Sequence, residues 1–427
     1  MTKISLINPP SPFLISDTVM PPLGLMYLSS NIKVNIDNNH DINNDDVKII
    51  DLAVNKDFKI PDNCDMYAFT STTPQYNITL SIMKKLKSKN QQSTFVIGGA
   101  HASCFSEECR KDGFDCVVIG EGERSIIDIY NFVTKHKKDN SFIRGIIRSR
   151  QIQNIDTIQF PDRTFDGYNK YKYILNEEKC ATMITSRGCP FKCSFCCNMW
   201  GNTVRLRSSE NVLQEVKQIK SSGTNAIQFY DDTFTVNKKR VEEICKGLKE
   251  MIITWRCFIH TNTIDLKLLE TMKNSGCVEV GIGVESGNQE ILNNINKKIE
   301  INKVIKICND CHTIGLRIKT FLIIGLPGES HKSVDDTIKF LKLANPDDYD
   351  YSIYTPFPRT DIWDNTNKYD IKFDKETLNY SKMFYKGIYG NYQSQVSTSN
   401  LSIEDIEKLR NYIDNDIRRE LYDKKYR

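Results

Sequence analysis

Three cysteines near the middle of the chain have a spacing suited to metal chemistry. Cys189, Cys193 and Cys196 lie in the segment Ser-Arg-Gly-Cys-Pro-Phe-Lys-Cys-Ser-Phe-Cys. Three thiolates so spaced can bind three irons of a [4Fe–4S] cube and leave the fourth iron open, whereas pure electron carriers use four cysteines. An open iron can accept a further ligand, so the spacing predicts a catalytic cluster.

Closely spaced cysteines also occur in zinc sites and as reduced thiols in a core. Zinc ribbons use paired Cys-x-x-Cys units, and no second pair lies at ribbon distance. Cys308 and Cys311 do form one such pair, but apolar residues recur around them at helical spacing, which favours a helix face. Cys197 is a fourth neighbouring thiol. We interpret it as a neighbour and not a ligand, because consecutive side chains rarely converge on one cube.

Length and composition narrow the class of protein. The chain has 427 residues, of which 26% are charged. Its net charge of +4 does not indicate the strongly basic surface that binds nucleic acid. It has no run of 18 apolar residues and no charged-then-apolar leader, so we expect neither a membrane span nor secretion. Fourteen cysteines without a leader indicate a reducing, cytoplasmic location and metal chemistry instead of disulfides.

Short apolar runs alternate with helical patterns in the first third of the chain. The runs cover residues 3–7, 47–51, 66–70, 95–97 and 116–119, and the helical patterns between them cover 23–32, 78–86, 104–111 and 125–133. This alternation predicts an α/β domain with a doubly wound, Rossmann-like parallel sheet. We expect it over residues 1–135, followed by a packed linker over 136–178.

Polar residues and glycines follow these strands, at the edge where parallel sheets bind ligands. Glycines at neighbouring strand ends let a large flat ligand approach the backbone closely. A dinucleotide fits poorly, because no Gly-x-Gly-x-x-Gly opens a helix after the first strand. The candidate binding residues are Asn8, Ser71, Thr72, Gly98, Gly99, His101, Gly120, Glu121, Gly122 and Glu123.

A second alternation with longer units begins near residue 181. Strands are expected over 181–185, 226–230, 255–261, 278–284, 318–324 and 349–354. Six such units predict a partial (β/α)6 barrel of the triosephosphate-isomerase type over 179–365, with its chemistry at the carboxyl ends of the strands. The cysteine segment follows the first of these strands, as that rule requires.

The last part of the chain, 366–427, is expected to be a small helical extension. Ser402 followed by Glu and Asp is typical of a capping start for an amphipathic helix. The tyrosine-rich stretch near 379–392 is expected to cover the mouth of the barrel.

The cysteine segment, with Phe195 before its last cysteine, resembles the signature of the radical S-adenosylmethionine (SAM) superfamily. The resemblance runs in order from 181 to about 360. It implies that SAM chelates the open iron through its amino and carboxylate groups. One electron from the cluster would then split the sulfonium to a 5′-deoxyadenosyl radical. The implied SAM-binding residues are Phe195, Asp231, Asp232, Glu285, Ser286, Ile323 and Gly325.

Each of these positions has an implied role and a plainer alternative. Asp231 and Asp232 match the site of the SAM amino group, and helix capping is the alternative. Glu285 and Ser286 match the ribose site, where the alternative is a turn. Ile323 and Gly325 match the adenine site, which acts through backbone and shape. Arg359 departs from relatives, which usually have glycine there.

The first domain resembles the cobalamin-binding domain that precedes many radical SAM cores. The matching segments are Asn8-Pro-Pro, Pro21-Pro-Leu-Gly, Gly98-Gly-x-His and Gly120-Glu-Gly-Glu. A histidine in Asp-x-His-x-x-Gly, which gives cobalt its lower ligand in mutases, is absent, and relatives commonly lack it too. The resemblance implies bound cobalamin, and the alternative is a fold that has lost this ligand.

These resemblances together imply a cobalamin-dependent radical SAM methyltransferase acting on an unactivated carbon or on phosphorus. Its cofactors would be a [4Fe–4S] cluster, SAM and cobalamin. Its partners would be a small-molecule substrate and an electron donor such as flavodoxin or ferredoxin. A second interpretation is a radical SAM enzyme that forms rings or rearranges its substrate without methyl transfer. A third is a cobalamin-sensing binding module.

Overall fold

The computed structural model describes residues 2–37, 46–55, 58–137, 143–383 and 393–423. The chain divides into two compact units. The first contains residues 1–173 together with 380–383, and the second contains 174–379 and 384–427. No helix within the described residues is long and apolar enough to cross a bilayer.

The first unit is built on a six-stranded parallel sheet with the order β2-β1-β3-β4-β5-β6. Its strands are β1 (Ile4–Asn8), β2 (Val47–Asp51), β3 (Met66–Thr70), β4 (Thr94–Gly98), β5 (Cys116–Ile119) and β6 (Gly145–Arg148). Its helices are α1 (Leu23–Asp37), α2 (Tyr76–Lys89), α3 (Ala100–Cys104), α4 (Ser106–Lys111) and α5 (Gly122–His136). The predicted doubly wound sheet is confirmed.

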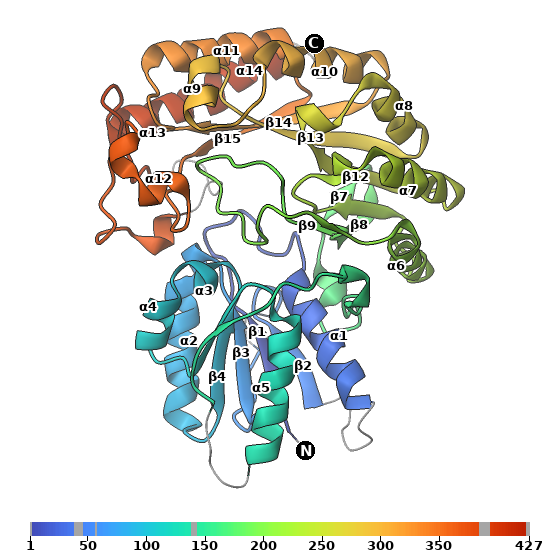
Figure 1. Cartoon of the computed structure of the whole chain (residues 1–427), viewed down its shortest axis with the longest axis vertical. Coiled ribbons are helices and arrows are strands. Elements are labelled where there is room, and N and C mark those ends of the chain that lie inside the picture. The colour runs from blue at the N-terminus through green and yellow to red at the C-terminus, as the bar shows by residue number, and fades with distance from the viewer. Residues whose placement is uncertain (1, 38–45, 56–57, 138–142, 384–392, 424–427) are drawn as a thin grey trace. The chain divides into compact units, whose positions relative to one another are not determined.

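Alternation along the strands produces two cores, one on each face of this sheet. On β1, Leu6 packs on the face covered by α1 and α5. Its neighbour Ile7 packs on the opposite face, with residues of α2, α3 and α4. The helices on the two faces are visible in Figure 1. Strands buried on both sides appear as continuous apolar runs, which is how the sequence shows them.

The predicted linker contributes more structure than we expected. Residues 145–148 form β6, which pairs in parallel with β5 and completes the sheet, and the first unit extends to Tyr173. The strand escaped prediction because only Ile146 and Ile147 are apolar in it and arginines surround them. A four-residue edge strand carries too little periodicity to stand out from a loop.

The second unit contains a seven-stranded sheet with the order β15-β14-β13-β12-β11-β8-β7. Its six parallel strands are β8 (Glu178–Met183), β11 (Ala226–Phe229), β12 (Thr254–Ile259), β13 (Cys277–Glu285), β14 (Arg317–Ile324) and β15 (Asp348–Ile353). The short β7 (Ile174–Leu175) pairs with β8 in antiparallel fashion. These strands match the six predicted for the partial barrel.

Helices cover one face of this sheet, as Figure 1 shows. They are α6 (Ser209–Ser221), α7 (Lys238–Glu250), α8 (Leu266–Asn274), α9 (Gln289–Asn294), α10 (Ile301–Thr313), α11 (His331–Ala344) and the terminal α13 (Ile403–Tyr412) and α14 (Arg418–Tyr422). Cys308 and Cys311 lie buried on α10 in the shared core, as their spacing indicated. Ser402 caps α13 in a capping box, as predicted.

The segment Tyr380–Met383 groups with the first unit. That the stretch 379–392 covers the barrel mouth stays a prediction. The Tyr380 hydroxyl donates to Glu108, and its ring lies 4.9 Å from Phe105 and 5.2 Å from His101, centroid to centroid. Aromatic contacts to distant residues cannot be predicted from local sequence, and residues 384–392 lie outside the described parts.

Candidate functional site

One buried carboxylate binds the start of the cysteine loop, where the loop leaves the first barrel strand. Asp231, which follows β11, is fully buried. Its two oxygens accept hydrogen bonds from the Thr185 backbone N–H and hydroxyl, both at 2.6 Å, and from the Ser186 hydroxyl at 2.7 Å. Charge-assisted hydrogen bonds of this length are strong. Asp231 therefore fixes the point at which the loop begins.

Gly188 sets the turn directly before the first cysteine. Its φ is +92°, and a β-carbon there would lie 2.5 Å from the Thr203 carbonyl oxygen and 2.9 Å from that of Gly201. The close approach lets the Cys189 N–H donate to the Gly201 carbonyl at 3.2 Å. The Asn202 amide adds a hydrogen bond to the Cys189 carbonyl, also at 3.2 Å. The loop is thus folded back on itself by backbone contacts.

We expect Gly188→Ala to disrupt this loop. The added methyl group meets immovable carbonyl groups as well as a disfavoured φ, so the change should cost more than the 1–2 kcal/mol typical of a left-handed alanine, roughly 3 kcal/mol. Iron content after anaerobic reconstitution and urea unfolding of the cluster-free protein measure the effect. Gly223→Ala is the matched control, because Gly223 has φ +84° and nothing within 4 Å of its β-carbon position. Equal behaviour of the two variants would contradict the steric argument.

The three predicted ligands lie together on this loop. Cys189 and Cys193 are partly exposed and Cys196 is exposed, and the Cys196 thiol feels the charges of the other two. Desolvation raises the pKa of Cys193, and the nearby Lys297 ammonium opposes that rise. Across the described residues, no three His, Cys, Asp or Glu side chains converge on a single ion. A cube does not require such convergence, because each thiolate binds its own iron, so three cysteines on one loop fit it.

A buried ion pair lies beside these thiols. Lys297 Nζ lies 2.6 Å from Glu285 Oε1, and both side chains are only 9% exposed. The Lys297 pKa is raised: burial lowers it, but the Glu285 carboxylate and then the Cys193 thiol outweigh burial. The ammonium also lies 6.0 Å from the centre of the Phe195 ring. Beside thiols that would hold a cluster, this buried ammonium would suit a carboxylate group of a ligand.

Glu285 adopts an unusual backbone conformation to reach that lysine. Its φ is +70°, and the pairing of β13 with β14 shifts register between Gly283 and Glu285. Bulges of this kind redirect a side chain at a strand end. Lys297 itself was missed by the sequence analysis, because it stands twelve residues beyond Glu285 outside any motif we used.

The two adjacent aspartates have different surroundings. Asp231 is occupied by the loop contacts described above, whereas Asp232 is exposed. Partial desolvation of its carboxyl group, and then repulsion by Asp231, raise the pKa of Asp232, while a hydrogen bond from the Gly188 backbone lowers it. Of the two carboxylates, Asp232 is therefore the one open to a positively charged ligand.

The ends of β13 and β14 carry the remaining predicted SAM residues. The Ser286 hydroxyl is buried and accepts from the Asn288 N–H at 3.2 Å. Ile323 is half-buried near the end of β14. Gly325 has φ +86°, and its N–H donates to the buried Glu329 carboxylate at 2.5 Å. Ser286 and Gly325 thus shape the strand ends through local hydrogen bonds.

Glu329 should make the stability of the protein depend on pH. Burial raises its pKa from 4.5 to about 8, although the Gly325 and Leu326 N–H groups lower it. The folded protein then holds a proton that the unfolded chain has lost, so the stabilisation is complete below about pH 4.5 and disappears as the pH rises through 8. From about pH 5 to 8 we expect a loss of roughly 4 kcal/mol in unfolding free energy. Urea unfolding should show this loss in the natural protein and not in Glu329→Gln; parallel pH profiles would contradict it.

The first unit offers bare backbone at two neighbouring strand ends. Gly98 ends β4 and Gly99 follows it, and Gly120 follows β5. A β-carbon would make ordinary contact at Gly120 (4.0 Å) and Gly98 (3.9 Å), whereas one on Gly99 would lie 2.9 Å from the Thr70 hydroxyl oxygen. Thr72, after β3, is exposed. These positions fit a large flat group lying against the strand ends, as cobalamin would.

Other predicted cobalamin residues are buried in the fold. His101 is fully buried, with its ring stacked on Tyr76 at a centroid distance of 3.8 Å, and burial lowers its pKa to about 3. Glu121 accepts a hydrogen bond from the Ile152 N–H at 2.8 Å. Ser71 and Glu123 are buried too, while Gly122 begins α5. These residues shape the strand ends from within.

Asn8 takes part in a polar cluster that the sequence did not indicate. Its amide donates to Asp51 Oδ1 at 2.9 Å, and the Tyr171 hydroxyl donates to the other oxygen of Asp51. Desolvation raises the pKa of Asp51, and the hydrogen bonds from Tyr171 and Asn8 lower it. Asp51 ends β2, so position after a strand was a signal that could have found it. Tyr171 had none.

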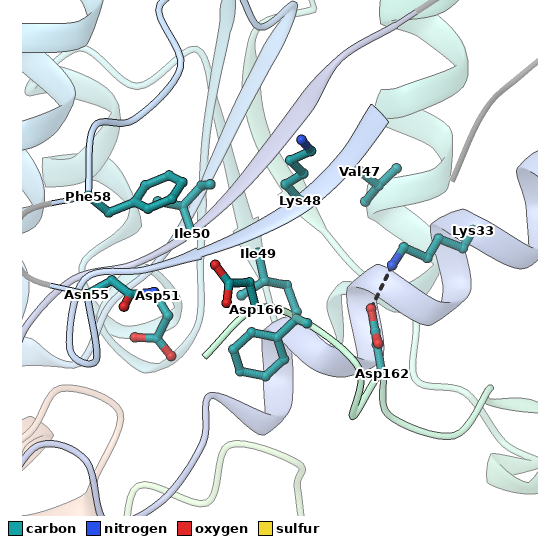
Figure 2. A pocket seen from close by; sticks show the side chains of 11 residues that line it. Lys33, Val47, Lys48, Ile49, Ile50, Asp51, Asn55, Phe58, Asp162 and Asp166 are labelled. Carbon is teal, nitrogen blue, oxygen red and sulfur yellow. Dashed lines mark hydrogen bonds and ion pairs between the residues drawn. The ribbon is translucent and has the colours of Figure 1, made fainter. Parts of the chain in front are cut away.

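Asp51 also lines a pocket of about 400 Å³ along the edge strand β2. Figure 2 shows its carboxylate and that of Asp166 near the apolar side chains of the strand, with the Lys33–Asp162 ion pair (2.8 Å) closing one end. None of the ten residues predicted to bind cobalamin lines this pocket. It is therefore distinct from the glycine-rich strand ends.

Comparison with known proteins gives both units a family. The radical SAM superfamily model matches residues 183–341, and the B12 binding domain model matches residues 16–129. An uncharacterized methyltransferase of Pyrococcus horikoshii is 32% identical over 390 residues, which cover 85% of this chain and 82% of the relative. The anaerobic magnesium-protoporphyrin IX monomethyl ester cyclase of Rubrivivax gelatinosus is 27% identical, covering 74% of this chain and 61% of the cyclase.

A solved structure shares the fold of most of the chain. It is the radical SAM methyltransferase TsrM from Kitasatospora setae, with cobalamin and a [4Fe–4S] cluster bound. Its TM-score is 0.67 at 14% identity, and the match covers 85% of this chain and 74% of that one.

Proposed function

The chain belongs to the radical SAM enzymes that carry a B12-binding domain, and from this premise we propose which residues hold its cofactors and what it acts on. The protein is an enzyme whose cofactors are a [4Fe–4S] cluster, SAM and cobalamin, and methyl transfer is the activity that best fits its relatives. The methyl acceptor is an unactivated carbon or a phosphorus centre of a small molecule.

The cysteine loop holds the cluster in this proposal. Cys189, Cys193 and Cys196 are its ligands, and Asp231 with Gly188 keeps the loop in place. When bound, the cluster supplies the electron that converts SAM into a radical, and cobalamin supplies a carrier for the methyl group. A flavodoxin or ferredoxin supplies that electron to the cluster.

The SAM molecule is oriented by charges on both sides of the cluster loop. Asp232 meets its ammonium group, and Lys297 meets its carboxylate while holding Glu285 near the ribose. The Gly325 backbone and Ile323 border the adenine. Support comes from the exposure of Asp232 and from the buried Glu285–Lys297 pair at 2.6 Å beside Cys193.

One observation carries the proposal of methyl transfer. A loop with three partly or fully exposed cysteines and a parallel sheet with glycines at its strand ends occur in the same chain. The loop would suit the cluster and the sheet would suit cobalamin, and methyl transfer uses both cofactors. The first sheet's strand ends Gly98, Gly99 and Gly120 border the cobalamin.

Incubation with SAM labelled on its methyl group tests the reaction. The reconstituted enzyme, given cobalamin, a reductant and small molecules from its source cells, should form 5′-deoxyadenosine and place label in a product. The cyclase relative makes ring formation the second candidate. That candidate predicts 5′-deoxyadenosine without labelled product, and this result would replace our proposal.

A further inference from the structure

Three aromatic rings line the inner face of the second unit's sheet. They belong to Tyr230, directly after β11, Phe258 on β12 and Phe321 on β14, and we call them the aromatic shelf. Phe258 contacts the other two rings edge to face, each at a centroid distance of 5.6 Å. Tyr230 is 41% exposed, and both phenylalanines are partly exposed.

The alternation along the strands places these rings away from the helices. On β12, Trp255 and Cys257 are buried in the core that the helices share, and on β14 Leu322 is buried there too. Phe258 and Phe321 occupy the intervening positions, so they point to the opposite face. In a partial barrel that face is the interior, and side chains near the carboxyl ends of its strands can meet a ligand.

Glycine on the strand between them lets the two phenyl rings meet. A β-carbon on Gly281 of β13 would lie 2.8 Å from Phe258 Cδ1 and 2.9 Å from Phe321 Cε2. The rings therefore cover Gly281 and form one continuous apolar surface across three strands. Any side chain at this position would divide the surface.

Charged residues bound the aromatic shelf on both sides along β13. Toward the start of the strand, Glu279 pairs with Arg256 at 2.9 Å. Toward its end, a β-carbon on Gly283 would lie 2.6 Å from Glu285 Oε1 and 3.1 Å from Lys297 Nζ. Two residues of strand separate Gly281 from Gly283, about 7 Å. The aromatic shelf thus lies one side-chain layer below the Glu285–Lys297 pair.

We propose that the aromatic shelf binds the flat, apolar ring system of the methyl acceptor. This inference rests on the proposed function and narrows its substrate to a class. Exposed aromatic surface gains most when an apolar partner removes it from water. Edge-to-face and offset-stacked contacts favour a flat ring partner. Its position one layer below the SAM-binding pair brings a bound ring within reach of the radical chemistry.

Equilibrium dialysis with a neutral probe tests the proposal on the reconstituted enzyme in the presence of SAM. The probe is 2-naphthol, and its saturated counterpart decahydro-2-naphthol serves as the comparison. We expect the enzyme to retain 2-naphthol more tightly, and Phe258→Leu and Phe321→Leu each to weaken retention about fivefold, the range of a lost aromatic pair. Phe132→Leu removes a partly exposed ring of the first unit and should change nothing.

Three results would overturn the proposal. They are no retention of 2-naphthol, equal retention of both probes, and retention that Phe258→Leu and Phe321→Leu leave unchanged. Loss of SAM binding in those variants, detected in the electron paramagnetic resonance change that SAM causes, would assign the rings to SAM. Gly281→Ala forces the rings apart without removing them and should weaken retention as well. The proposed function fails separately, by absence of labelled product in the natural enzyme.

Discussion

Replacing Cys193 by alanine is expected to abolish both the [4Fe–4S] cluster and the formation of 5′-deoxyadenosine. Three thiolates are the only protein ligands of a cube with an open iron, so losing one leaves two irons without a protein ligand. Iron and sulfide content after anaerobic reconstitution measures the first effect. Chromatography of the reaction mixture for 5′-deoxyadenosine measures the second.

Cys197→Ala is the matched control for this variant. Cys197 is adjacent to Cys196, yet its sulfur contacts the Met199 sulfur at 3.6 Å. We expect this variant to keep its iron and its SAM cleavage. Equal loss in both variants would mean that Cys197 is a ligand and that the cube is fully coordinated by protein, which would remove the place for SAM.

Lys297→Met should produce the largest loss of stability among single substitutions at this site. The change leaves the Glu285 carboxylate buried without its partner, and breaking a buried ion pair costs about 3–5 kcal/mol. Urea unfolding of the cluster-free protein measures it. The double variant Lys297→Met with Glu285→Gln should recover part of the loss, because no unpaired charge remains.

Lys408→Met is the control, because it removes the same charge from an exposed ion pair. The Lys408–Glu404 pair is 2.8 Å long, and its side chains are 70% and 76% exposed. Exposed pairs contribute little, so its loss should leave the unfolding free energy almost unchanged. If Lys297→Met reduced the unfolding free energy as little as this control, the buried pair would stabilise the protein no more than an exposed one. In reconstituted enzyme, Lys297→Met should also weaken SAM binding, as the proposed contact with the SAM carboxylate requires.

The parts of this protein that local sequence predicted are those with short-range signals. Buried strands such as β4 and β5 appear as apolar runs, and the spacing of Cys189, Cys193 and Cys196 indicates a loop in a single stretch. The capping start at Ser402 is equally local. These features place both sheets and the cluster loop without any knowledge of long-range contacts.

The remaining features depend on where the chain is brought by folding. Asp231 and Asp232 are adjacent in sequence, and only the structure shows that one holds the loop while the other faces outward. Lys297 becomes significant through burial beside Cys193, which no spacing indicates. Tyr380 contacts Glu108, which lies 272 positions earlier in the chain. Such long-range pairs leave no trace in hydrophobic periodicity.

The two glycines on the inner side of β13 determine how the interior can be redesigned. Because Gly281 and Gly283 lack side chains, the space in front of them is filled by Phe258 of β12, Phe321 of β14, Lys297 after α9 and Glu285 at the end of β13. Residues on β12 and β14 can therefore be exchanged to suit another acceptor, while the residues of β13 stay unchanged. Engineering of new selectivity should vary Phe258 and Phe321 and leave both glycines untouched.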